Sequence, residues 1–237
     1  MSDGMSNGGR GESPSAANLV KRRWTQEGAS PLGDLQWATR EVRIDGAGFA
    51  SVAEFPVRWS DGAAAITASK YFRRRGVGPE DGGERSLAQV VTRIASAVSG
   101  AALRFDLTDG RGARALSDEI ALAMASQRMA FNSPVWFNVG LHEAYGITSV
   151  GGGSWAWDPV CGRAVEAEDA YRNPQCSACF ILSVEDSLES IFEVAKNEAR
   201  IFKFGSGSGV SVSSLRGAGE PLRGGGVSSG TLSWLRL

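Results

Sequence analysis

Residues 175–237 constrain the fold most strongly, because they place a cysteine, an apolar run, a capped helix and a glycine-rich segment in one continuous order. Cys179 leads into FIL, a short run typical of a buried strand. Asp186, followed three residues later by Glu189, matches a capping box and predicts a helix of about 18 residues that ends at Gly205. The rest of the chain is expected to be a platform for this unit. The predicted apolar face of the helix comprises Leu188, Ile191, Phe192, Ala195, Ala199 and Phe202.

The composition excludes several classes of protein. The chain has 237 residues, 42% of them hydrophobic and 22% charged, with a formal net charge of -1. This is a globular composition, sufficient for one large or two small domains, and its near-neutrality argues against a broad nucleic-acid-binding face. No apolar run of about 18 residues could span a membrane, and the first residues lack the apolar core of a secretory signal. We therefore expect a cytoplasmic protein.

Before residue 175, polar segments alternate with segments in which apolar residues recur at the spacing of a helix or a strand. Residues 1–33, rich in Gly, Ser and Asn, predict a disordered tail with a solvated basic cluster at residues 21–23. Gly110 and Gly112 are expected to separate two amphipathic helices. The predicted elements are strands at 39–44 and 49–57 around a turn at 46–48, helices at 63–75, 87–98 and 116–124, a strand or tight loop at 131–140, and an irregular connection or small hairpin at 148–174.

The glycine-rich segment 205–209 matches neither a phosphate-binding Walker loop nor a dinucleotide fingerprint. Alternate glycines let backbone N–H groups approach a ligand closely, and Arg216 and Arg223 could supply charge for phosphate; the plainer alternative is a flexible turn with two surface arginines. Residues 231–237 read as a final strand. Because a strand without a neighbour leaves its backbone groups unpaired, we expect the chain to be a fragment.

The three cysteines, at positions 161, 176 and 179, cannot all pair with one another. Residues three apart on a strand point to opposite faces, so a disulfide between Cys176 and Cys179 is geometrically poor. Three alternatives remain open: buried structural thiols, a zinc site that also uses His142, and a redox role for Cys179 with a partner thiol elsewhere.

Several separated motifs, taken in one order, resemble a known family: KYFRR at 70–74, then FNSPVWFNVG, QCSACFILSVEDSLESI, IFKFGSGSG, SSLRG and GGGVSSG. From about residue 36 to residue 237 the chain resembles the N-terminal part of adenosylcobalamin-dependent (class II) ribonucleotide reductases. The resemblance implies an α/β fold, with a mostly helical region at 34–130 and the first strands and helices of an incomplete ten-stranded barrel at 131–237. It implies reduction of ribonucleotides to 2′-deoxyribonucleotides for DNA synthesis, as in a vitamin B12-dependent ribonucleoside-diphosphate reductase, with adenosylcobalamin as radical generator.

The resemblance also implies roles for individual residues. Cys179 matches the cysteine that reduces substrate and is oxidised to a disulfide. The substrate-contacting positions are Ser133, Ala178, Cys179 and Gly207, and the positions around an allosteric deoxynucleotide effector are Asp186, Ser187, Leu188, Arg216 and Arg223. Helix 187–204 matches a homodimer interface, and the implied reductant is a thioredoxin-like or other dithiol. No metal ligand, nucleic acid or membrane is implied.

Some positions depart from the family pattern. Cys176 is not an expected family cysteine, Ser211 stands where Asn is frequent, and Thr231-Leu232 stands where Gly-Pro is common. The segment with the radical cysteine, the second redox cysteine and most of the cobalamin surface is not found, so this chain alone is not expected to turn over. The alternatives are the large subunit of a class I, metal-cofactor reductase, and a non-catalytic nucleotide-binding or dimerisation module.

Overall fold

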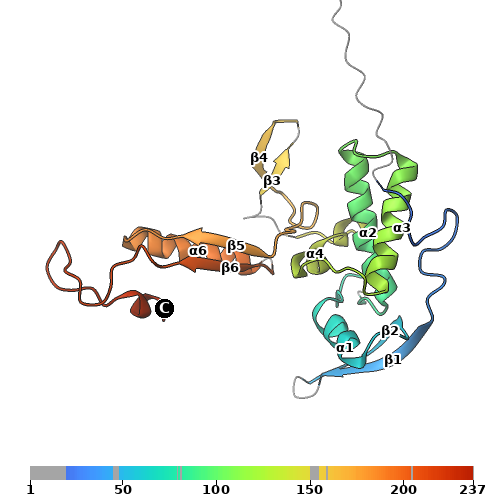
Figure 1. Ribbon diagram of the computed structural model, residues 1–237, viewed down its shortest axis with the longest axis horizontal. Helices are drawn as coiled ribbons and strands as arrows, with labels where there is room; N and C mark the ends of the chain where they lie inside the picture. Colours follow the sequence, from blue (N-terminus) through green and yellow to red (C-terminus); the bar gives the residue numbers. More distant parts are fainter. Residues whose placement is uncertain are drawn as a thin grey trace, which may run out of the picture. The chain divides into compact units, whose positions relative to one another are not determined.

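The computed structural model describes residues 20–44, 48–78, 80, 82–149, 155–158, 160–203 and 205–236, and the side chain of Phe49 is not among the described atoms. The predictions for residues 1–19, most of the turn at 46–48, and residue 237 lie outside this set. The chain divides into two compact units (Figure 1): Met1–Phe72 with Glu84–Ala130, and Arg73–Gly83 with Phe131–Leu237. No helix in the described part of the chain is both long and apolar enough to cross a membrane.

The first unit begins with a β-hairpin. Strand β1 (Trp37–Ile44) pairs antiparallel with β2 (Phe49–Pro56) along its whole length, which confirms the two predicted strands. Helix α1 (Asp61–Lys70) follows, with Ser60 as its N-cap, so it starts and ends earlier than predicted. The ring of Phe55 on β2 is fully buried.

Two packed helices complete the core of this unit, as their periodicity predicted. Helix α2 (Leu87–Arg104) starts with a capping box between Ser86 and Gln89. Helix α3 (Gly110–Ala125) starts at Asp109, whose carboxylate accepts from the backbone N–H of Gly112. Gly110 and Gly112 therefore lie in the first turn of α3, and the prediction that they separate the helices is wrong. A side chain at Gly112 would bring its Cβ to 1.9 Å from Thr108 Oγ1, so the close approach of Thr108 accounts for this glycine.

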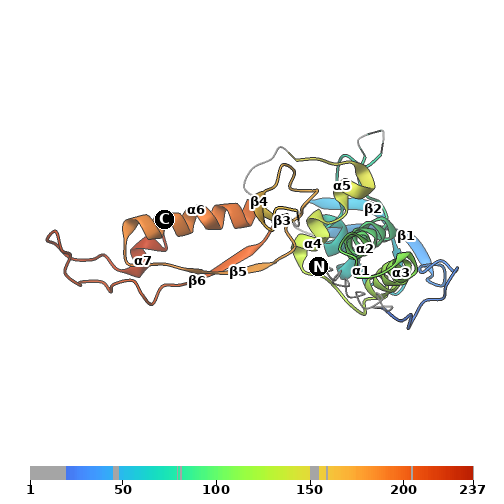
Figure 2. The same ribbon diagram turned by 90° about the horizontal axis from the view of Figure 1, so that it is seen from above.

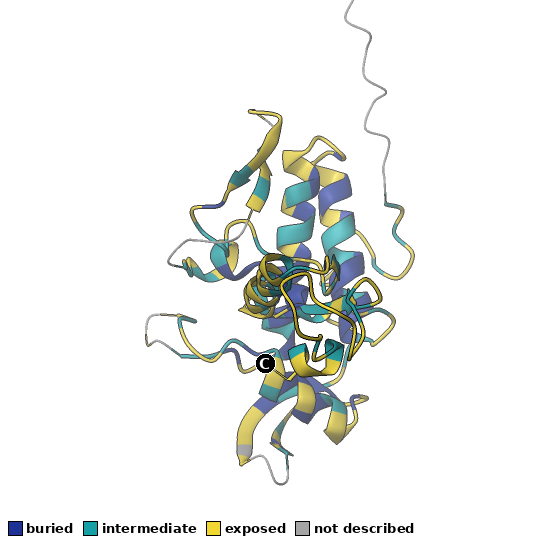
Figure 3. Cartoon of the chain, turned by 90° about the vertical axis from the view of Figure 1, so that its left-hand side faces the viewer, coloured by how far each residue is buried: buried dark blue, intermediate teal, exposed yellow. Residues whose placement is uncertain are grey.

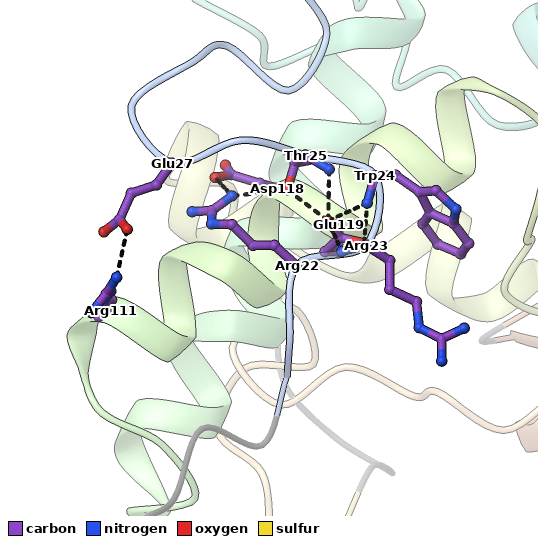
Figure 4. A network of polar contacts seen from close by, with 8 residues as sticks. All are labelled: Arg22, Arg23, Trp24, Thr25, Glu27, Arg111, Asp118 and Glu119. Atoms are coloured by element: carbon purple, nitrogen blue, oxygen red, sulfur yellow. Dashed lines mark hydrogen bonds and ion pairs between the residues drawn. The ribbon is translucent and has the colours of Figure 1, made fainter.

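An N-terminal strap, residues 22–27, crosses α3 (Figure 4). The buried carboxylate of Glu119 accepts hydrogen bonds from three successive backbone N–H groups, those of residues 23, 24 and 25, at 2.9–3.1 Å. It also accepts from the Thr25 hydroxyl at 2.7 Å. The predicted disorder is thus wrong for the strap, because a carboxylate from a distant helix satisfies its backbone. Two ion pairs flank this site, Arg22–Asp118 at 2.7 Å and Arg111–Glu27 at 2.8 Å.

The second unit contains short helices where a strand was predicted. Residues 131–140 were expected to be a strand or tight loop, but they contain helix α4 (Ser133–Asn138) and lead to α5 (Leu141–Tyr145). Pro134 lies in the first turn of α4, where a missing N–H breaks no helical bond. The indole of Trp136 donates to the carbonyl of Phe131 and closes the turn.

The connection at 148–174 contains the small hairpin considered from the sequence, β3 (Trp155–Asp158) antiparallel to β4 (Arg163–Glu166). After it come β5 (Cys179–Ser183), α6 (Leu188–Lys203) and β6 (Gly207–Ser211). β5 confirms the predicted strand, whereas the expected glycine loop continues as a strand from Gly207. Strands β5 and β6 are parallel, with α6 as the crossover that runs alongside them (Figure 2).

The last described element is one helical turn, α7 (Thr231–Trp234), so the predicted final strand is wrong. Gly230 has a φ of 81°, and the Ser233 hydroxyl donates to the carbonyl of Ser229, which closes the turn. The inference of a fragment from an unpaired strand therefore no longer applies. The fold is mixed α/β: in the described residues each sheet has two strands, and no closed barrel is formed.

Candidate functional site

Cys179 lies at the first position of β5, directly opposite Gly207 at the first position of β6. The backbone N–H of Gly207 donates to the carbonyl of Ala178 at 2.6 Å, so the residue before the cysteine is held by the neighbouring strand. Cys179 is exposed and is not in a disulfide. The structure thus brings together three predicted substrate-site residues, Ala178, Cys179 and Gly207, at one end of the strand pair.

The turn that leads into β6 explains how Gly207 reaches this position. Gly205 has a φ of 79°, its N–H donates to the carbonyl of Phe202, and the N–H of Ser206 donates to the carbonyl of Ile201. These two bonds form a Schellman motif at the end of α6. A Cβ at Gly205 would lie 2.8 Å from the ring of Phe137, so only glycine fits between the turn and α4.

Ser133, the fourth predicted substrate residue, is the first residue of α4. It lies four residues before Phe137, and residues at this spacing share one face of a helix. Because Phe137 contacts the turn at Gly205, this face of α4 meets the end of the strand pair where Cys179 starts. Figures 1 and 2 show α4 at that end of β5 and β6.

The other two cysteines do not join this cluster as a disulfide. All three cysteines are exposed and free, which argues against buried structural thiols. Residues 174–178 contain no turn or bend that would fold Cys176 back onto Cys179, and both thiols are free. Although Cys176 is exposed as a residue, its sulfur is partly desolvated, which raises its pKa. Hydrogen bonding to Asp158 raises the pKa of Cys161, so neither cysteine is activated as a thiolate.

No group of three or more His, Cys, Asp or Glu side chains able to hold a metal occurs among the described residues. The zinc alternative required His142 together with the cysteines. His142 instead lies 3.5 Å from Asp169 and contacts the carbonyl of Ile147 through Nδ1. Asp169 Oδ1 in turn accepts from the backbone and hydroxyl of Ser149, so this cluster joins loops.

A second cluster surrounds the start of α6. Ser187 caps the helix by accepting from the N–H of Ser190, and the prediction that Asp186 is the cap is wrong. The Asp186 carboxylate is instead bonded by the Arg216 guanidinium, Nε to Oδ2 at 2.6 Å. The neighbouring Ser214 hydroxyl bonds to the carbonyl of Val184 and fixes the arginine-bearing segment to the end of β5.

A cavity of about 500 Å³ opens beside this ion pair. Four of the five predicted effector residues line it: Asp186, Ser187, Leu188 and Arg216. Arg223 does not; it lies in the exposed turn at 222–226. Sequence reasoning missed the apolar lining, which includes Leu215, Leu222, Val227 and Trp234. Only the folding back of residues 215–234 over α6 reveals it.

The outer face of α6 carries an exposed apolar seam, defined as Leu188, Phe192, Ala195, Ala199 and Phe202. The spacing of four, three, four and three residues is that of a coiled-coil interface. Leu188, Phe192 and Phe202 are 69%, 60% and 54% exposed, whereas Val194 on the opposite face is buried. Figure 3 shows α6 mainly in the colour of exposed residues. The helix therefore packs one side against its own strands and leaves the seam exposed, although Leu188 and Phe192 also line the cavity.

Comparison with known proteins matches both units. The family model described as class II vitamin B12-dependent ribonucleotide reductase matches residues 49–127, and the ribonucleotide reductase barrel domain matches residues 177–237. A vitamin B12-dependent ribonucleotide reductase of Agrobacterium fabrum is 37% identical over 259 residues, covering 92% of this chain and 20% of the relative. One from Rhodopirellula baltica is 38% identical over 218 residues, covering 89% and 21%. A ribonucleoside-diphosphate reductase subunit alpha of Treponema pallidum is 39% identical over 64 residues, covering 27% and 8%.

Proposed function

The chain belongs to the class II vitamin B12-dependent ribonucleotide reductase family, and we propose that it supplies the substrate-reducing thiol and the effector pocket of such an enzyme. It spans about a fifth of the length of the curated relatives it matches, so the activity proposed is that of the whole protein. The similarity to the two vitamin B12-dependent relatives covers about nine-tenths of the chain, against 27% for the subunit alpha relative, which favours the cobalamin class over the metal-cofactor alternative.

The reaction replaces the 2′-hydroxyl of a ribonucleotide by hydrogen and releases water, which consumes two electrons. Two thiols that close to one disulfide supply these electrons and the protons. Cys179 is proposed as one of the two. The other is proposed to be a thiol outside these 237 residues, because Cys179 forms no disulfide with Cys161 or Cys176 in this structure. An external dithiol, such as a thioredoxin-like protein, then exchanges with the disulfide and restores both thiols.

One observation carries the proposal: the exposed thiol of Cys179 stands at an end of a strand pair, beside backbone that glycine leaves bare. Gly207 presents no side chain next to it, so a ribose can approach the sulfur closely. Ser133 lies on the face of α4 that meets this end, in a position to donate a hydrogen bond to a substrate oxygen. Ala178 and Gly207 hold the cysteine by their mutual backbone bond.

The cofactor proposed is adenosylcobalamin, which in this family generates the radical that activates the ribose. The described residues do not fit it: the cavity of about 500 Å³ is small for a corrinoid, and the chain's single histidine is engaged with Asp169.

The decisive experiment replaces the thiol. In the full-length protein, assayed with adenosylcobalamin, ribonucleotide and dithiothreitol, we expect Cys179→Ser to abolish multiple turnover. Cys161→Ser, which removes an exposed thiol from the β3–β4 hairpin, is the matched control and should retain activity. Multiple turnover by Cys179→Ser would reject the redox assignment. Activity that needs a second, metal-bearing subunit would favour the class I alternative.

The cavity beside the Asp186–Arg216 ion pair is proposed to hold a deoxynucleotide effector. Planar guanidinium groups bind phosphate bidentately, and four residues that line the same cavity add hydroxyl groups: Ser228, Ser229, Thr231 and Ser233. Arg223 is proposed to reach the phosphates from the adjoining turn. The apolar lining suits a base.

The exposed seam of α6 is proposed to pair with a second copy of the chain, in a homodimer. A seam of five apolar residues spaced for coiled-coil packing buries its surface most simply against the same helix of a partner. The seam starts at Leu188, which also lines the effector cavity, so the proposed dimer interface and the effector site adjoin.

A further inference from the structure

We propose that Ser206 is a positioning residue for the reducing cysteine, acting through the backbone of residues 177 and 178. This inference rests on the proposed redox role of Cys179. Ser206 is 8% exposed, and its hydroxyl donates to the carbonyl of Ser177. The next residue, Gly207, donates its N–H to the carbonyl of Ala178 at 2.6 Å. Two successive carbonyls directly before Cys179 are therefore held by two successive residues.

The hydrogen bond from the Ser206 hydroxyl to Ser177, called the clamp below, starts from a residue that is itself bonded to the end of α6. The N–H of Ser206 closes the Schellman motif to Ile201, so the same residue is bonded to the end of α6 through its backbone and to the cysteine segment through its side chain. Gly205 permits the left-handed turn, and the ring of Phe137 fills the space that any side chain at Gly205 would need.

The clamp matters because residues 174–178 have no regular structure of their own. Without the Ser206 hydroxyl, this segment would keep one fewer bond to β6, and the thiol that follows it would sample more positions. A group that must meet a reacting carbon loses rate when its orientation loosens, while binding of the substrate elsewhere is little affected. The predicted effect therefore falls on kcat more than on KM.

A matched control lies two residues further along the chain. The Ser208 hydroxyl donates to the Glu198 carboxylate of α6 at 2.7 Å, and not to the cysteine segment. Ser208→Ala removes a comparable hydrogen bond from the same strand. It thereby separates a loss of general stability from a loss of cysteine positioning.

The test compares Ser206→Ala and Ser208→Ala in the full-length protein. We expect Ser206→Ala to lower kcat about 3- to 10-fold, the range of one net hydrogen bond, with the KM for ribonucleotide within about twofold. Ser208→Ala should leave both constants unchanged. Unchanged kcat in Ser206→Ala, or an equal loss in both variants, would overturn the proposal.

A second measurement does not depend on turnover. Iodoacetamide alkylates accessible thiols, and the alkylation of Cys179 is followed by mass spectrometry of the tryptic peptide 173–196. This peptide also contains Cys176, so fragment ions are used to assign the modified cysteine. Cys161 lies on another tryptic peptide. The rate at which Cys179 is alkylated should differ from that of the unsubstituted protein in Ser206→Ala but not in Ser208→Ala, because only the first change releases the segment before the thiol. Equal rates in the two variants would overturn the proposal. If the unsubstituted protein has no reductase activity, the proposed function fails and this comparison still judges the clamp.

Discussion

Neutralising Glu119 should release the N-terminal strap from α3. The carboxylate accepts four hydrogen bonds from residues 23–25. A hydrogen bond to a charged group contributes about 1.5–3 kcal/mol, and the four share one oxygen, so their sum is not additive. Glu119→Gln keeps an acceptor oxygen but loses the charge, and its NH2 group replaces the second oxygen, which lies 3.4 Å from the backbone nitrogen of Trp24. We estimate a loss of about 2–4 kcal/mol in strap docking.

The rate of limited trypsin digestion measures this loss of docking, because trypsin cleaves the strap after Arg22 and Arg23. When opening is fast relative to cleavage, the cleavage rate follows the open population. A loss of 2 kcal/mol or more then raises the rate at least about 30-fold, until the strap is fully open. Glu41→Gln is the control, because its carboxylate is exposed and bonds Arg43 of the same strand. Equal strap cleavage in both variants would refute the reasoning.

The same site predicts a pH dependence. Burial works to raise the pKa of Glu119, but the bonds from Thr25, Trp24 and Arg23 outweigh it, and the net pKa is lowered. A lowered pKa stabilises the docked strap above the ordinary glutamate pKa, about 4.3, and this stability is lost as pH falls through the lowered value. Hydrogen exchange of the amides of residues 23–25, corrected for intrinsic rates, should rise below about pH 4 in the unsubstituted protein. In Glu119→Gln it should be fast already at pH 7.

Three further outcomes are expected. Arg216→Ala should weaken effector binding by about 1.5–3 kcal/mol in titration calorimetry of the full-length protein. The control Arg200→Ala, on the exposed side of α6, should leave effector binding unchanged. An unchanged dissociation constant in Arg216→Ala would show that Arg216 does not bind the effector. Phe192→Asp places a charge in the seam and should shift light-scattering mass from dimer to monomer; a dimer of unchanged affinity would place the interface elsewhere. Arg93→Ala leaves the buried Glu84 carboxylate without its arginine and should cost about 3–5 kcal/mol in urea unfolding, so a loss below about 1 kcal/mol would contradict the account.

Local patterns predicted the elements whose bonds and apolar faces are local. The alternation of residues 39–44 and 49–57 predicted β1 and β2, and the spacing of Leu87, Val90, Val91 and Ile94 predicted α2. These four α2 side chains are fully buried, because the pattern that selects the helix also selects the face it buries. Boundaries were less accurate, since Ser60 and Asp109 start helices that apolar periodicity places later.

The failures share a physical cause. Residues 131–140 were read as a strand or tight loop and residues 231–237 as a strand, but Pro134 and Gly230 allow helical turns, which side-chain hydrogen bonds close. The strap was read as disordered because residues 1–33 are rich in Gly, Ser and Asn, but the distant Glu119 accepts from its N–H groups. Asp186 was read as a cap because a nearby Glu189 fits the motif, yet Arg216, thirty residues away, takes the carboxylate.

The sequence alone indicated the resemblance to class II ribonucleotide reductases and the residues proposed as the reducing thiol and around the effector, because motifs report chemistry through residue type and order. Only the tertiary structure decided that Gly207 lies opposite Cys179, that Glu119 holds the strap, and that the apolar seam of α6 faces outward. Each of these depends on residues far apart in the chain meeting in space, and no local periodicity encodes such a meeting.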